Sequence, residues 1–470
     1  MSAHRVFSYL VDRFVRSGED TALRRLVVAA GRGVIRQPWF RPFLVHYVSR
    51  RLEPCGPPTK NAGGIRLLVL NRERYEPDLE VLAAHPSVEL VSLPSDVQHL
   101  LNAIFVSRIR AITEQDPSAY LRTDHPAVAS ARADLRRFLQ RFISALARRN
   151  GFDAMISCTF YYRQDREWEA AGHPAGVPFF VLHKENMKDP VIHAASIERY
   201  RTNHFKFTGD RLFLFNDLEK EVIVKSGVCS EEKISVVGGL RMDNIYRRVA
   251  TDAVAEPKRQ VVLFSFHHCV GLLRIPGLKG FFNGERDAGF VEYFDLVHGT
   301  LARFAHENPD VSVVIKPKWA NHWIPHIETA IRRTTGLDAE TIPNLTITAD
   351  VPAQTLIEQS AVVVGINSTT LLEAKLFGRP VVVPLFAEAA GEYYDKHVYF
   401  QNYLETFNVA RSPEELVEAI EDELEGRAPR RHIPPEMVAD YLGFFDGETC
   451  KRVVALMRQD IEAARTRRGW

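Results

Sequence analysis

The apolar residues of this chain fall into short continuous runs that alternate with longer stretches of helical periodicity. Continuous apolar runs bounded by turn residues are typical of strands buried on both faces of a parallel sheet. In the first half these runs are 65–71, 88–93, 153–157, 177–182, 211–215 and 234–237. A long helix is expected over 129–149, because it ends at Asn150-Gly151 as a left-handed cap would. The alternation of strand and helix predicts a doubly wound parallel sheet over residues 61–245.

The apolar pattern is lost over residues 244–258, which carry charges and Pro257, and it then restarts. Further strands are expected at 261–265, 311–315, 345–348, 362–364 and 381–383, and helices at 289–307, 352–359, 414–425 and 449–465. This second alternation predicts another parallel-sheet domain over 259–430. Residues 1–60 are expected to form a helical extension. Residues 431–470 are expected to form helices that pack back on the first domain.

The second domain contains a strand, loop, helix and strand over residues 362–384, the unit from which parallel sheets are built. Its loop reads Asn367-Ser368-Thr369-Thr370, and Gly378 ends the helix. The free N–H groups at the start of such a helix, together with these hydroxyls, suit a phosphate. The alternative is that Ser368 or Thr370 only caps the helix, and Thr370 with Glu373 fits a capping box.

Composition narrows the function without defining it. Of the 470 residues 46% are hydrophobic and 25% charged, which is typical of globular proteins. With 60 basic and 59 acidic residues the net charge is +1, so no overall field attracts nucleic acid or an anionic membrane, and any anion site must be local. The five cysteines are scattered without metal-ligand spacing, which favours a reducing compartment and hence the cytoplasm.

The first residues lack the continuous apolar core of a signal peptide, and no stretch reaches the length of a membrane span. A soluble protein is therefore expected. Residues 1–53 nevertheless mix Arg with Phe, Trp and Leu at roughly helical spacing. Such a stripe either contacts a membrane surface peripherally or packs on the protein itself.

Several polar residues follow predicted strands and therefore belong at the carboxyl edge of a sheet, where ligands of open α/β sheets bind. In the first half these are His183, Lys184 and Glu185. In the second half they are Ser265, His267, His268, Lys316, Lys318 and the loop at 367–370. Two such sheets facing a central cleft would place both sets around one ligand, although each residue alone is also compatible with a solvated surface.

Four segments in this order resemble glycosyltransferases of the GT-B architecture, especially those of bacterial capsule and surface-polysaccharide synthesis. They are Leu182-His183-Lys184-Glu185-Asn186, then Thr208-Gly209-Asp210 with 216–217 and 236–243, then Ile315-Lys316-Pro317-Lys318, and finally 367–373. Teichoic-acid polyol-phosphate transferases and UDP-N-acetylglucosamine 2-epimerase are more distantly similar. The resemblance covers residues 60–425. Where many relatives carry His-Pro, this chain has Lys316-Pro317.

The resemblance implies two Rossmann-like domains, with a nucleotide-sugar donor on residues 260–385 and an acceptor on residues 65–240. It assigns phosphate contacts to the Ser-Thr pair and a ribose contact to Glu373. Lys316 and Lys318 would stabilise the charge of the departing nucleotide. No Asp-x-Asp motif is present, so no obligatory metal and no cofactor other than the nucleotide-sugar substrate are expected.

Transfer to a hydroxyl acceptor also needs a general base. Glu185 and His183 are the candidates, since residues two apart share a face of an extended chain and Lys184 points the other way. The alternatives are a structural salt bridge for Glu185 and a packed side chain for His183. Arg163, Asp165 and Glu169 are weaker acceptor-side candidates that would equally suit a solvated helix face, and Lys184 is a further weak acceptor-side candidate. Neither Cys158 nor Cys269 has a partner pattern for nucleophilic catalysis.

Three functions follow from this pattern. The first is metal-independent transfer of a sugar from a nucleotide sugar to a surface or capsular polysaccharide, with an oligosaccharide or glycolipid acceptor. The second is transfer of polyol phosphate from a CDP-polyol. The third is a non-catalytic scaffold of a polysaccharide assembly complex. Nucleic acid is not an expected partner.

Overall fold

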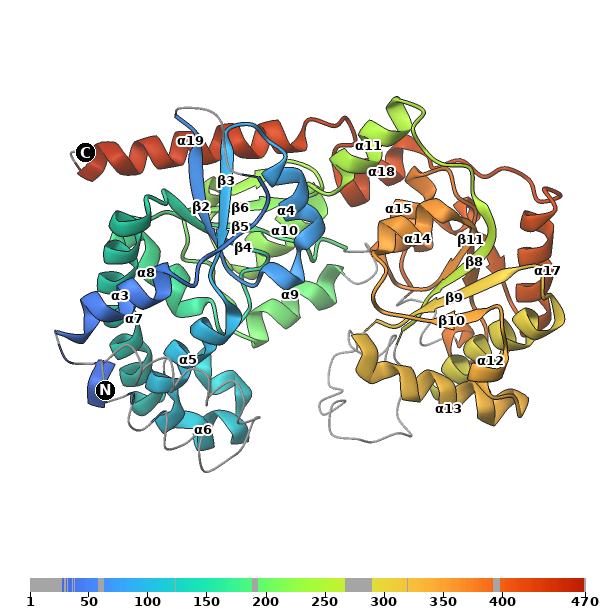
Figure 1. Ribbon diagram of the computed structural model, residues 1–470, viewed down its shortest axis with the longest axis horizontal. Coiled ribbons are helices and arrows are strands. Elements are labelled where there is room, and N and C mark those ends of the chain that lie inside the picture. Colours follow the sequence, from blue (N-terminus) through green and yellow to red (C-terminus); the bar gives the residue numbers. More distant parts are fainter. Residues whose placement is uncertain are drawn as a thin grey trace. The chain divides into compact units, whose positions relative to one another are not determined.

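A computed structural model of the chain describes residues 28, 31, 33–35, 37, 39–57, 63–122, 124–187, 193–266, 290–318, 320–391 and 398–468. The chain divides into two compact units. The first consists of the described parts of Met1–Asn186, Ile197–Asp243 and Gly443–Trp470. The second consists of the described parts of Met187–Ser196 and Asn244–Leu442. Each unit is built around one sheet (Figure 1).

The first sheet has seven strands in the order β1-β3-β2-β4-β5-β6-β7. They are β1 (Glu53–Pro54), β2 (Ile65–Val69), β3 (Val88–Ser92), β4 (Ala154–Ser157), β5 (Phe179–Leu182), β6 (Arg211–Leu214) and β7 (Ile234–Val236). All neighbouring pairs are parallel except the short edge strand β1, which is antiparallel to β3. After the edge strand β1, the chain enters the sheet at β2, moves outward to β3 and then continues at β4 on the other side of β2, so the strand order reverses at β2.

Helices cover both faces of this sheet. They are α3 (Phe40–Ser49), α4 (Glu76–Ala83), α5 (Ser95–Val106), α6 (Arg110–Gln115), α7 (Pro126–Asn150), α8 (Arg166–Ala175), α9 (His193–Thr202), α10 (Asp217–Ser226) and α19 (Thr449–Arg468). Leu68 and Met155 belong to one apolar cluster with α3, α5, α7 and α8. Leu67 and Ile156, which point to the other face, share a second cluster with α4 and α19. Successive residues of a strand therefore place their side chains in opposite apolar layers, one on each face of the sheet.

The second sheet has six parallel strands in the order β10-β9-β8-β11-β12-β13. They are β8 (Lys258–Phe264), β9 (Ser312–Lys316), β10 (Leu345–Ile347), β11 (Ser360–Gly365), β12 (Val381–Pro384) and β13 (Asn408–Ala410). Figure 1 shows helices on either side of this sheet, with α14 and α15 opposite α12 and α13. The helices of this unit are α11 (Met242–Ala250), α12 (Val291–Glu307), α13 (Ile324–Thr335), α14 (Ala353–Gln359), α15 (Thr369–Leu376), α17 (Pro413–Leu424) and α18 (Pro435–Leu442).

The two Rossmann-like parallel sheets expected from the sequence are confirmed. The C-terminal helices divide between the units, because α18 belongs to the second unit and α19 to the first. The apolar stripe near the N-terminus packs on the protein where it is described, since Phe40, Leu44 and Val48 of α3 are buried in the core of the first unit. Trp39, by contrast, is 62% exposed.

Candidate functional site

The strand order of the second sheet reverses between β8 and β11, and ligands of open α/β sheets bind beyond the carboxyl ends of the strands at such a point. Ser265 directly follows β8, and the loop at 366–368 follows β11. Phe264 pairs with Gly365 on one side and with Lys316 on the other. The structure therefore brings Ser265, Ser368 and Lys316 to the same edge of one sheet, as the sequence predicted.

The helix α15 begins at this edge with Ser368 as its N-cap. Ser368 Oγ accepts hydrogen bonds from the backbone N–H of Thr370 at 3.3 Å and from the Thr370 hydroxyl at 2.8 Å. These two bonds use the lone pairs of Ser368 and leave its proton to donate. Asn367 adopts a left-handed conformation with φ of 49°, which asparagine tolerates better than most residues, and its Oδ1 accepts from the N–H of Tyr399 at 2.7 Å. The amide of Asn367 thus anchors the loop.

Glu373 lies in the second turn of α15 and is buried. Its Oε2 accepts a hydrogen bond from Nε2 of Gln354 on α14 at 3.2 Å. Because Ser368 is the N-cap, Thr370 and Glu373 are both inside the helix and do not form the capping box that their spacing suggested. The capping box is therefore wrong, whereas the cap by Ser368 that the sequence also allowed is observed, and the carboxylate of Glu373 links α15 to α14.

Lys316 is the last residue of β9, and its ammonium donates to the carbonyl oxygens of Ala349 and Val351, both at 2.7 Å. These two bonds hold the segment between β10 and α14 against the sheet edge. Burial lowers the pKa of Lys316, with the nearby Asp350 acting in the opposite direction. Of the three ammonium hydrogens two serve the protein, which leaves one for a ligand. Lys318, two residues further on, is exposed.

Ser265 is buried and its hydroxyl lies 2.8 Å from Nε2 of His298, which projects from the middle of α12. The other ring nitrogen of His298, Nδ1, lies 2.6 Å from the carbonyl oxygen of Phe294. Burial lowers the pKa of His298 to about 4, so the imidazole is neutral at pH 7. The sequence suggested Ser265 but not His298. His267 and His268, which were also candidates, lie outside the described residues.

In the first unit the strand order reverses at β2, and the buried carboxylate of Asp165 lies beside that point. It accepts hydrogen bonds from Ser157 Oγ at 2.6 Å, Asn71 Nδ2 at 2.6 Å and Gln98 Nε2 at 2.7 Å. Burial raises the pKa of Asp165, and the three hydrogen bonds oppose that shift. All these partners belong to the protein, so Asp165 ties β2, β4 and α5 together.

The other acceptor-side candidates are also engaged with protein groups. Glu169 is buried and accepts from both the backbone N–H and the hydroxyl of Thr208. Arg163 is exposed, and its guanidinium lies over the Tyr120 ring, 4.5 Å from the centroid. Glu169 therefore does not lie on a solvated helix face, whereas Arg163 is exposed and lies just before α8.

The two candidates for the general base are in different environments. His183 is completely buried, with Nε2 3.3 Å from Oε1 of Glu219 and its ring centroid 4.9 Å from that of Phe160. The side chain of Glu185 is 50% exposed. The two side chains therefore differ in access to a ligand, because His183 is enclosed in the core and Glu185 reaches solvent. Lys184 donates to the carbonyl oxygen of Arg74 at 3.0 Å.

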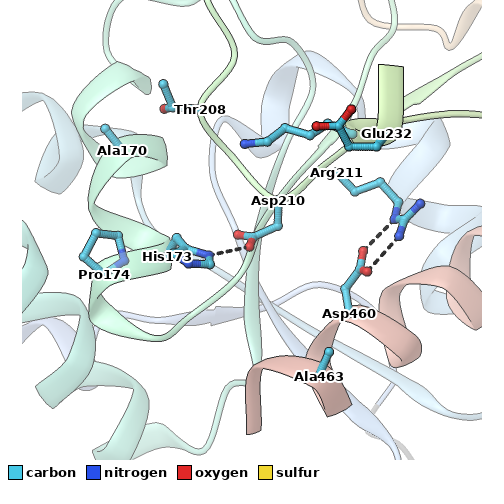
Figure 2. A pocket seen from close by; sticks show the side chains of 10 residues that line it. Ala170, His173, Pro174, Thr208, Asp210, Arg211, Glu232, Asp460 and Ala463 are labelled. Atoms are coloured by element: carbon cyan, nitrogen blue, oxygen red, sulfur yellow. Dashed lines mark hydrogen bonds and ion pairs between the residues drawn. The ribbon is translucent and has the colours of Figure 1, made fainter. Parts of the chain in front are cut away.

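A hollow of about 490 Å³ lies at the opposite edge of the first sheet, beside Arg211, where β6 begins. Figure 2 shows two side-chain contacts in its wall: a hydrogen bond between His173 and Asp210, and an ion pair between Arg211 and Asp460 of α19. The guanidinium contacts Asp460 through two nitrogens, at 2.6 and 2.8 Å. The Arg211–Asp460 ion pair fastens α19 to the sheet, and none of the predicted site residues lines this hollow.

Among the described residues, no group of three or more histidine, cysteine, aspartate or glutamate side chains is arranged to hold a metal ion. In the same part of the chain, no helix is both long enough and apolar enough to cross a membrane.

Residues 287–418 match the family described as capsule polysaccharide biosynthesis protein. No curated protein matches the chain. Among solved structures, a UDP-GlcNAc 2-epimerase from Neisseria meningitidis bound to UDP-GlcNAc is 12% identical, covering 84% of this chain and 100% of its own, with a TM-score of 0.44. An α,α-trehalose-phosphate synthase (UDP-forming) from Burkholderia vietnamiensis is 13% identical, covering 86% and 99%, with a TM-score of 0.44. The wall teichoic acid polymerase TagF is 13% identical, covering 66% and 74%, with a TM-score of 0.38.

The architecture rests on the strand order of the two sheets. The molecule is an α/β protein with two Rossmann-like units. Its resemblance to capsule polysaccharide biosynthesis proteins is confirmed over residues 287–418, a segment that contains Lys316, Ser368 and Glu373.

Proposed function

We propose that the protein is a glycosyltransferase that moves a sugar from a nucleotide-sugar donor to a surface or capsular polysaccharide. One observation carries the proposal. The reversal point of the second sheet is flanked by the N-terminus of α15, where Ser368 keeps a hydroxyl proton to donate, and α15 lies in the segment that matches capsule polysaccharide biosynthesis proteins. A helix N-terminus with hydroxyl donors favours a phosphate, and it has the charge that a nucleotide leaving group needs.

In the proposed reaction the bond between the anomeric carbon and the phosphate oxygen breaks, and a bond to an acceptor hydroxyl oxygen forms. The nucleotide takes the bonding electrons, and the α15 N-terminus and the remaining N–H of Lys316 stabilise its charge. A general base removes the acceptor proton. Glu185 is the better candidate because its carboxylate is half exposed, whereas His183 is enclosed beside Glu219. The reaction needs no metal in this proposal.

Nucleotide binding tests the proposal, with thermal shift and calorimetry against CMP, UDP, GDP and CDP. Ser368→Ala should weaken the preferred nucleotide about tenfold, because a charge-assisted hydrogen bond to phosphate is lost. The matched control is Ser412→Ala. Ser412 caps α17 in the same unit by accepting from the N–H of Glu415, and it follows β13 at the far edge of the sheet. Both variants lose a cap worth about 1 kcal/mol, so only the difference in affinity reports on the site.

The same experiment separates the rival functions. Binding of CDP alone, with transfer of a polyol phosphate, would favour the phosphotransferase. If no nucleotide binds, the non-catalytic scaffold of a polysaccharide assembly complex would be the remaining function. Hydrolysis of the donor in the absence of acceptor, unchanged by EDTA, is the expected result for a metal-independent glycosyltransferase. Complete loss of this activity in EDTA would instead show that a metal takes part.

A further inference from the structure

The tautomer of His298 is determined by its surroundings. Nδ1 lies 2.6 Å from the carbonyl oxygen of Phe294, and a carbonyl oxygen only accepts hydrogen bonds, so Nδ1 carries the proton. Burial keeps the imidazole neutral, and Nε2 is therefore an unprotonated acceptor. At 2.8 Å from Nε2, Ser265 Oγ must donate its single proton to the ring. The second acceptor within reach of that proton, the carbonyl oxygen of Phe266, is more distant at 3.3 Å.

This arrangement gives the two serines at the reversal point opposite hydrogen-bonding character. Ser368 accepts two hydrogen bonds from Thr370 and keeps its proton to donate. Ser265 donates its hydroxyl proton to His298, so only its lone pairs remain for a ligand. A phosphate oxygen needs a donor, so it pairs well with Ser368 and is repelled by the lone pairs of Ser265. A hydroxyl group of the ligand pairs well with Ser265.

We propose that His298 is a positioning residue that turns Ser265 into an obligate acceptor for a sugar or ribose hydroxyl next to the phosphate-binding end of α15. The inference rests on the proposed function, because it assigns a further contact within the same site. The two serines follow adjacent strands, β8 and β11, and adjacent strands are about 5 Å apart. The ligand must then carry a hydroxyl donor beside its phosphate, a requirement that nucleotide sugars satisfy with their sugar and ribose hydroxyls, which inorganic pyrophosphate lacks.

The first test addresses the proton itself and needs no ligand. In protein labelled with ¹⁵N-histidine, long-range ¹H–¹⁵N spectra distinguish protonated from unprotonated ring nitrogens. His298 should show a protonated Nδ1 and an unprotonated Nε2 at pH 7.5, with its signals identified by their loss in His298→Gln. An Nε2–H tautomer or an imidazolium would mean that Ser265 accepts from the ring and has its proton free, which would overturn the inference.

The second test compares Ser265→Ala with the wild type by calorimetry. The probes are inorganic pyrophosphate and the nucleotide sugars UDP-glucose, UDP-N-acetylglucosamine and GDP-mannose. The variant should bind the preferred nucleotide sugar about tenfold more weakly and pyrophosphate within about twofold of the wild type. Equal weakening of both ligands, or no weakening of either, would contradict the assigned contact. A merely structural role of Ser265 would move both affinities together.

A third variant, His298→Leu, removes the acceptor for the Ser265 proton while retaining an apolar side chain among Phe266 and Phe294. The ratio of the affinity for nucleotide sugar to the affinity for pyrophosphate should fall, since Ser265 is then able to donate to phosphate. An unchanged preference in a folded variant would overturn the positioning role. If the wild type binds none of the nucleotide sugars, the proposed function and the assigned contact fail together. The tautomer measurement still decides the orientation of Ser265.

Discussion

The ammonium of Lys316 lies 2.7 Å from the carbonyl oxygen of Val351, and it lies at the same distance from that of Ala349. The lysine at the end of β9 thus has a structural task in addition to the donor contact expected from its position in the sequence. Lys316→Ala should lower the free energy of unfolding of the second unit by about 1 to 3 kcal/mol, because two carbonyl oxygens lose a charged donor. Chemical unfolding followed by tryptophan fluorescence, with Trp323 in this unit, measures the change.

The same variant should weaken nucleotide binding at least about tenfold in calorimetry, because the remaining N–H is lost from the leaving-group site. Lys258→Ala is the matched control for charge, since Lys258 is an exposed lysine at the start of β8, at the opposite end of that strand from Ser265. A stable Lys316→Ala protein with unchanged affinity would restrict Lys316 to holding the segment between β10 and α14.

The strands were predictable because each is a short apolar run between turn residues, and most observed strands lie within two or three residues of their expected positions. The edge strand β13 was not predicted. It has only three residues, Asn408–Ala410, two of which are partly buried, so it lacks the continuous apolar run of the central strands. Edge strands bury less surface and leave a weaker pattern in the sequence.

Site residues could be predicted from the sequence only where their partners lie close to them along the chain. Ser368 could be found because a cap lies next to the helix it caps. The partners of Lys316 and Ser265, at Ala349 and His298, are each 33 residues distant in sequence and meet them only in the folded sheet. His298 falls on the buried face of α12, and nothing in the sequence distinguishes it from an ordinary core residue. The alternation of residues 183 to 185 did not reveal that His183 is fully buried while the side chain of Glu185 is 50% exposed.

The proposed general base, Glu185, gives a further prediction. Glu185→Gln should abolish sugar transfer while leaving donor affinity unchanged, because the amide retains the shape of the side chain but has no basic oxygen. Donor hydrolysis and acceptor-dependent transfer measure the effect. His183→Gln is the comparison: its ring is buried beside Glu219, so the first consequence expected there is a loss of stability. Normal transfer by the Glu185 variant would remove this residue from the mechanism.

The buried His298 predicts acid sensitivity. Its pKa is about 4 in the folded protein and about 6.5 when unfolded, so the unfolded chain binds the additional proton between these values. The stabilising contribution is fully present above pH 6.5 and is lost as the pH falls towards 4. The full loss amounts to about 3 kcal/mol. The melting temperature of the second unit should therefore drop between pH 7 and 5, and the drop should be smaller in His298→Gln. Equal slopes in both proteins would show that other groups control the acid transition.

The last prediction concerns Asp165, which the sequence offered as an acceptor-side residue. Its carboxylate accepts hydrogen bonds from Ser157, Asn71 and Gln98, and all three donors are supplied by the protein. Asp165→Asn places an amide NH₂ among these donors, where at least one hydrogen bond must be lost. We expect the free energy of unfolding of the first unit to fall by about 3 kcal/mol, as measured by urea denaturation. Arg163→Ala, which removes only the contact with the Tyr120 ring, should cost about 1 kcal/mol or less. A fully stable Asp165→Asn protein with impaired acceptor binding would instead show that Asp165 takes part in acceptor binding.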